Sequence, residues 1–127
     1  SLALVGAAMT AGAALAQDAE HGKEYYTQYC ATCHGTGGAG DGPLTELMTT
    51  SVPDLTTLSS ANDGEFPMLN VIHVIDGRTG VRAHGGPMPV YGALFKAESG
   101  TDSAYADVLY VRGKVLSIAY YLEEIQK

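Results

Sequence analysis

The chain has 127 residues, a formal net charge of −7 from 14 acidic and 7 basic side chains, and two cysteines. This length fits one domain, and the negative charge excludes a nucleic-acid binder, which needs a basic face to displace counterions from phosphates. Two cysteines are too few for a disulfide-rich scaffold, and a hydrophobic fraction of 46% argues against disorder.

The first 17 residues carry no ionisable side chain and are mostly small and apolar, ending in Ala14-Leu15-Ala16. This pattern predicts a secretory signal peptide over residues 1–16, cleaved after Ala16, and a mature domain over residues 17–127. The alternative is an N-terminal membrane anchor. The apolar stretch spans only about 22 Å as a helix, against a hydrocarbon core of roughly 30 Å, so an anchor would need residues further upstream.

Helical periodicity and helix-end signals recur along the mature part, and no alternating strand pattern persists. Asp18 is the expected N-cap of the first helix. Pro43 and Pro67 each fit a first helical position, and Gly77 fits a helix end. We therefore predict an all-α protein with helices at about residues 19–29, 43–48, 67–76, 91–95 and 108–125, the last with an apolar stripe of Val108, Val111, Val115, Ile118, Leu122 and Ile125.

The motif Cys30-Ala31-Thr32-Cys33-His34 carries the chemistry. In an exported protein, C-x-x-C-H is typical of covalent haem c attachment: two thiols form thioethers with the vinyl groups of the porphyrin, and the histidine binds the iron. A zinc site would need further ligands at metal-binding spacing. A thioredoxin-like dithiol would need a βαβ context, and a disulfide across this short gap is the remaining alternative.

The segment around this motif resembles the start of a class I cytochrome c domain, in which a glycine, an aromatic and C-x-x-C-H are separated by three residues each, here Gly22, Tyr26 and Cys30. Residues 85–92 (GGPMPVYG) are similar to the distal methionine loop of that family, and residues 40–43 and 53–56 to its intervening loop. The resemblance covers essentially all of residues 17–127. It implies a cytochrome c fold of about four to five helices around one covalently bound haem.

A second axial ligand is expected from the distal loop. Met88 lies between Pro87 and Pro89, in a segment that cannot be helix interior, and a thioether opposite the histidine gives the ligation typical of electron transfer. We therefore predict His34 and Met88 as the metal ligands. His84 is the main alternative and would give bis-histidine ligation with a lower potential. Met48 is also a possible ligand but is expected to pack against the haem edge, and Met68 is expected to pack in the core.

The resemblance also suggests supporting residues. In this family a loop proline supplies the carbonyl that orients the ligating histidine, and Pro43 is the nearest candidate. Arg82, together with Arg78, is placed to pair with haem propionates, or else is a solvated loop charge. Tyr91 is close enough in sequence to Met88 to reach a propionate as well.

Gly22 and Tyr26 share one helical face. In the family the first and last helices cross closely at this point. The predicted role is structural: the glycine lets the two backbones approach, and Tyr26 packs on Tyr120 or Tyr121.

The function implied is that of a periplasmic single-electron carrier with one covalent haem c. Its acidic surface favours redox partners with basic docking surfaces, and membrane association would require the N-terminal segment to be retained. Two alternatives stay open. The chain could be an electron-transfer subunit of an oxidoreductase complex, or a haem-based sensor, which would need a labile sixth ligand.

Overall fold

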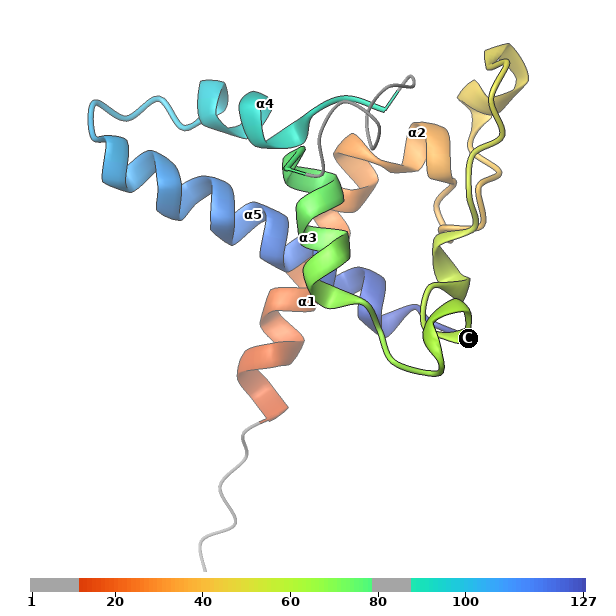
Figure 1. Cartoon of the computed structure of the whole chain (residues 1–127). Coiled ribbons are helices and arrows are strands. Elements are labelled where there is room, and N and C mark those ends of the chain that lie inside the picture. The colour runs from red at the N-terminus through yellow and green to blue at the C-terminus, as the bar shows by residue number, and fades with distance from the viewer. Residues whose placement is uncertain (1–11, 79–87) are drawn as a thin grey trace, which may run out of the picture.

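A computed structural model describes residues 12–78 and 88–127 (Figure 1). These residues contain no strand, which confirms the all-α prediction. Three short 3-10 helices lie on the chain between the second and third α-helices, over Pro43–Leu47, Leu55–Thr57 and Ser60–Asn62. The α-helices are α1 (Gly12–Tyr29), α2 (Ala31–His34), α3 (Met68–Asp76), α4 (Tyr91–Glu98) and α5 (Ala104–Glu124).

The first helix is longer than expected. It begins at Gly12, so the prediction of Asp18 as its N-cap is wrong. The alanine-rich residues before Asp18 have high helix propensity and continue the helix towards the N-terminus, and this end of α1 projects away from the other helices in Figure 1. The predicted cleavage after Ala16 stays a prediction. Within the described part of the chain, no helix is both long and apolar enough to cross a membrane.

The crossing of α1 and α5 is the central packing contact, as Figure 1 shows. A Cβ on Gly22 would lie 1.9 Å from the carbonyl oxygen of Ser117, so only glycine permits this approach. Four residues later, Tyr26 is fully buried and its ring lies 5.1 Å from that of Tyr121. The predicted glycine–aromatic crossing is thus confirmed, with Tyr121 rather than Tyr120 as the aromatic partner.

The apolar stripe of α5 is buried over only part of its length. Val115, Ile118 and Leu122 are buried, whereas Val108 is 42% exposed. The reason is geometric: the N-terminal half of α5 extends beyond α1 and lies beside α4 (Figure 1). Helical periodicity alone therefore overestimated how far the core extends.

The end of α3 packs closely against the start of α4. Gly77 ends α3 in the left-handed conformation (φ 85°), as predicted. A Cβ on Gly92 would lie 2.6 Å from the backbone oxygen of Asp76. Helix α4 extends to Glu98, beyond the single short segment expected from the sequence. This contact fixes where the chain resumes after residues 79–87.

Candidate functional site

The C-x-x-C-H motif forms a compact helical turn directly after α1. The backbone N–H groups of Cys33 and His34 both donate to the carbonyl of Cys30, at 3.1 and 2.9 Å. From α1, the Tyr26 hydroxyl donates to the Gly35 carbonyl at 2.6 Å and anchors the end of the turn. Cys30 and Cys33 form no disulfide with each other, which leaves both sulfur atoms for other bonds; Cys30 is buried, whereas Cys33 is half-buried.

The His34 ring is buried and oriented by a backbone carbonyl. Its Nδ1 lies 3.4 Å from the carbonyl oxygen of Pro53, which accepts a hydrogen bond when Nδ1 carries the proton. Burial lowers the pKa of His34, and the Pro53 contact opposes part of that effect. The ring is therefore held in the neutral form with Nε2 available to a metal.

This carbonyl comes from a different proline than predicted. Pro43 is exposed and begins a 3-10 helix, where its fixed φ is favourable. The proline whose carbonyl orients His34 is therefore Pro53 and not Pro43. A signal for Pro53 was present, because it begins one of the segments that carried the family resemblance. Proximity in sequence to the motif favoured the wrong proline.

Glycines let the loop after the motif fold back onto it. The Gly40 and Gly42 N–H groups donate to the carbonyls of His34 (2.8 Å) and Cys33 (3.1 Å). A Cβ on Gly40 (φ 79°) would lie 2.4 Å from the Val52 carbonyl oxygen. This close approach brings the Val52–Pro53 segment of the loop next to the C-x-x-C-H turn, so that the Pro53 carbonyl reaches His34.

Two adjoining cavities, of about 270 and 200 Å³, lie on the inner side of the motif. Both are mostly apolar and share the same central residues, which makes them parts of one site. The shared residues are Cys30, His34, Pro53, Val74 and Met88.

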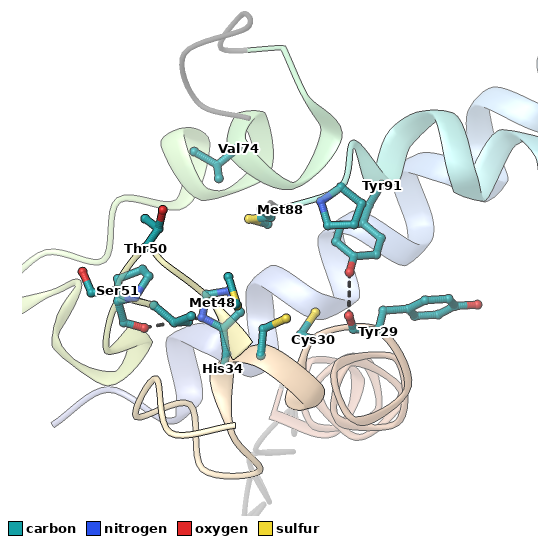
Figure 2. A pocket seen from close by; sticks show the side chains of 13 residues that line it. Tyr29, Cys30, His34, Met48, Thr50, Ser51, Val74, Met88 and Tyr91 are labelled. Atoms are coloured by element: carbon teal, nitrogen blue, oxygen red, sulfur yellow. Dashed lines mark hydrogen bonds between the residues drawn. The ribbon is translucent and has the colours of Figure 1, made fainter. Parts of the chain in front are cut away.

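Met88 lies on the opposite side of this cavity from His34 (Figure 2). Met48 also lines it, whereas Met68 packs against the apolar core, as predicted. An apolar cavity with an imidazole on one side, a thioether on the other and two thiols at its edge fits a haem c. The predicted residues Arg82 and His84 lie outside the described residues.

Tyr91 lines the cavity, and its hydroxyl has a partner in α1. It donates to the backbone carbonyl of Tyr29 at 2.6 Å, and burial raises the pKa of Tyr91 to about 12, so it stays a neutral donor. This hydrogen bond ties Tyr91 to α1, and the contact with a propionate stays a prediction. Arg78 is exposed and pairs with Asp76.

Sequence reasoning missed further lining residues, among them Tyr29 and Val74. Tyr29 directly precedes the motif and Val74 lies within α3, and both line the larger cavity. The only indication in the sequence is that Tyr29 precedes Cys30 and that Val74 precedes the apolar Ile75. Within the described residues, no three His, Cys, Asp or Glu side chains gather where they could hold a metal ion.

An all-α fold that places a C-x-x-C-H turn beside an apolar cavity defines a class I c-type cytochrome. The sequence model of the family described as cytochrome c oxidase, cbb3-type, subunit III matches residues 17–99, and the chain belongs to this family. No curated protein and no solved structure matches the chain significantly. Membership establishes a covalently bound haem c with iron and a role in haem-based electron transfer.

Proposed function

We propose that the protein is a periplasmic single-electron carrier in which Cys30 and Cys33 hold the haem covalently and His34 and Met88 are its axial ligands. The observation that carries this proposal is the placement of His34 and Met88 on opposite sides of one apolar cavity that the two thiols border (Figure 2). When bound, the haem supplies an iron that gains and loses one electron.

The chain's own residues favour electron transfer over ligand binding. The Pro53 carbonyl orients His34, and a thioether on the other side is a soft donor that favours ferrous iron. With both axial positions filled by the protein, little would rearrange when the electron moves. Val74 and the other apolar lining residues would keep water away and thereby support a high potential.

A partner would meet the edge of the cavity near Cys33, which is half-buried while Cys30 is buried. The net charge of −7 would steer encounters towards basic docking surfaces, with association rates that fall as salt rises. Export to the periplasm agrees with the predicted signal peptide over residues 1–16, since the family match begins at residue 17.

The test is a comparison of two cavity methionines. Oxidised wild-type protein should show the weak near-infrared methionine-to-iron band, and Met88→Ala should abolish it. Met48→Ala is the matched control, because Met48 lines the same cavity. This variant should retain the band, since Met48 is not the proposed ligand. A band that survives in Met88→Ala, or a high-spin wild type that binds carbon monoxide rapidly, would overturn the ligand assignment.

The family match favours a second candidate, an electron-transfer subunit of a membrane oxidoreductase complex. The two candidates differ in where the native protein resides. A carrier should be recovered as a free monomer in the soluble periplasmic fraction. A subunit should instead migrate with a detergent-solubilised complex that loses oxidoreductase turnover when this chain is removed.

A further inference from the structure

A buried lysine lies on α5, outside the cavity. Lys114 is 6% exposed, and its Nζ lies 2.8 Å from Glu98 Oε2 and 3.0 Å from the Tyr29 hydroxyl. A fully buried lysine is rare unless it is paired. Four aromatic rings surround the ammonium group with centroids at 4.6 to 5.1 Å, those of Tyr25, Tyr29, Phe95 and Tyr110.

The lysine is charged in this environment. Burial alone would lower the pKa of Lys114, but the hydrogen bonds to Glu98 and Tyr29 outweigh burial and raise it. The hydrogen bond from Lys114 likewise holds the pKa of the Glu98 carboxyl below its usual range. Ring faces attract cations, most strongly where water is excluded. The ammonium, Glu98 and Tyr29 therefore form one joined network across three helices.

This network reaches the cavity through Tyr29. The Tyr29 hydroxyl contacts Glu98 and Lys114, while its backbone carbonyl accepts the Tyr91 hydroxyl at 2.6 Å (Figure 2). The Tyr29 and Tyr91 rings also meet edge to face at 6.0 Å. Tyr91 is the first residue of α4 and follows Met88 by three positions. Both ends of α4 are thus tied to α1, at Tyr91 and at Glu98.

We propose that Lys114 is a positioning residue that, through Glu98, Tyr29 and Tyr91, fixes the start of α4 and so holds Met88 at the iron. The inference rests on the proposed function, in which Met88 is an axial ligand. A thioether is a weak ligand, so its occupancy depends on how firmly the protein holds it. Lys114 does not line the cavity, so it acts only through Glu98 and the two tyrosines.

The experiment measures how readily added imidazole displaces Met88 from the oxidised haem protein, read as loss of the near-infrared band. Lys114→Met keeps much of the apolar length inside the ring cluster and removes the charge. We expect the affinity of this variant for imidazole to rise about tenfold, because the loss of one hydrogen bond to a charged group shifts an equilibrium by about this factor. Lys96→Met is the control: Lys96 is an exposed lysine on α4, and its removal should leave the affinity unchanged.

A second variant keeps the proposal testable if Lys114→Met does not fold. Tyr29→Phe retains the ring and the carbonyl that Tyr91 contacts but removes the hydroxyl, and should raise imidazole affinity about threefold. An affinity within about twofold of wild type in either folded variant, with only a lower free energy of unfolding, would overturn the inference. A wild type without the near-infrared band would instead overturn the proposed function.

Discussion

The two sides of the cavity are built differently. On the His34 side, the contacts come mostly from nearby in the chain, beginning with the His34 N–H, which donates to the Cys30 carbonyl in the same turn. From the loop that follows, the Gly40 N–H donates to the His34 carbonyl and the Pro53 carbonyl faces Nδ1. On the Met88 side, the contacts join helices far apart in sequence, such as Tyr91 to Tyr29. One side depends on local chain geometry and the other on tertiary packing.

The difference suggests how each side should fail. Perturbing the loop behind the motif should weaken the fold around the covalent attachment without releasing the haem. Perturbing the packing of α4 should release Met88 while the His34 side stays intact. Substitutions on each side of the cavity therefore distinguish the two modes of failure.

Replacing Cys30 and Cys33 together by alanine should have the largest effect. Acidified organic solvent protonates the histidine and dissociates axial ligands but leaves thioether bonds intact. We therefore expect haem to be extracted from the double variant and retained by wild type. Thr32→Ala, an exposed residue of the same turn, is the control and should retain it. Extraction of haem from wild type would contradict covalent attachment.

Gly42→Ala should damage the His34 side. A Cβ there would lie 2.4 Å from the Thr32 carbonyl oxygen and 2.5 Å from the carbonyl carbon and oxygen of Cys33, all backbone atoms that cannot move aside. We expect the free energy of unfolding to fall by about 2–3 kcal/mol in guanidinium titrations. Gly37→Ala, where a Cβ meets nothing within 4 Å, should change it by less than about 0.5 kcal/mol. Equal effects would contradict the packing described.

Gly92→Ala should damage the Met88 side. A Cβ would lie 2.2 Å from Asp76 Oδ1 and 2.6 Å from its backbone oxygen, forcing the start of α4 away from α3. The gain in helix propensity offsets part of the clash, so we expect a net loss of about 1–2 kcal/mol in the free energy of unfolding. We also expect a weaker near-infrared band, which Gly42→Ala should leave unchanged.

The control for Gly92→Ala is Gly113→Ala in the middle of α5. A Cβ at Gly113 meets nothing within 4 Å, so removing a helical glycine should raise the free energy of unfolding by about 0.5–1 kcal/mol. A band that weakens equally in both variants would show that α4 packing is not what holds Met88.

Glu98→Gln should have the smallest effect, and one that depends on pH. The hydrogen bond from Lys114 lowers the pKa of Glu98. The ionised carboxylate therefore stabilises the fold fully at pH values above the ordinary carboxyl pKa of about 4.3. That stability is lost as pH falls through the lowered folded-state pKa. The difference in unfolding midpoint between wild type and Glu98→Gln should therefore shrink from pH 7 towards pH 3. A constant difference would contradict the pairing, and the exposed Glu46→Gln is the control.

Short-range features were the ones that sequence patterns predicted well. The C-x-x-C-H turn and the end of α3 at Gly77 follow from spacing within one or two turns. The close helix crossing at Gly22 was implied by the family resemblance. Pro43 was chosen over Pro53 because the sequence does not report how far a glycine-rich loop folds back. Lys114 directly precedes Val115 of the apolar stripe, and no sequence pattern indicated that Glu98 of α4 would meet it.

The spacing of C-x-x-C-H is enough to define the class of protein, because the covalent chemistry of haem c needs two thiols and a histidine at one fixed spacing, and no tertiary contact changes that spacing. The groups that surround this chemistry become visible in the folded chain: the carbonyl beside His34, the partner of the Tyr91 hydroxyl and the burial of Lys114. The first depends on how far the glycine-rich loop folds back, and the other two depend on where separate helices meet. That is set by packing of whole faces and by the absence of a Cβ at a few glycines, which no local pattern encodes.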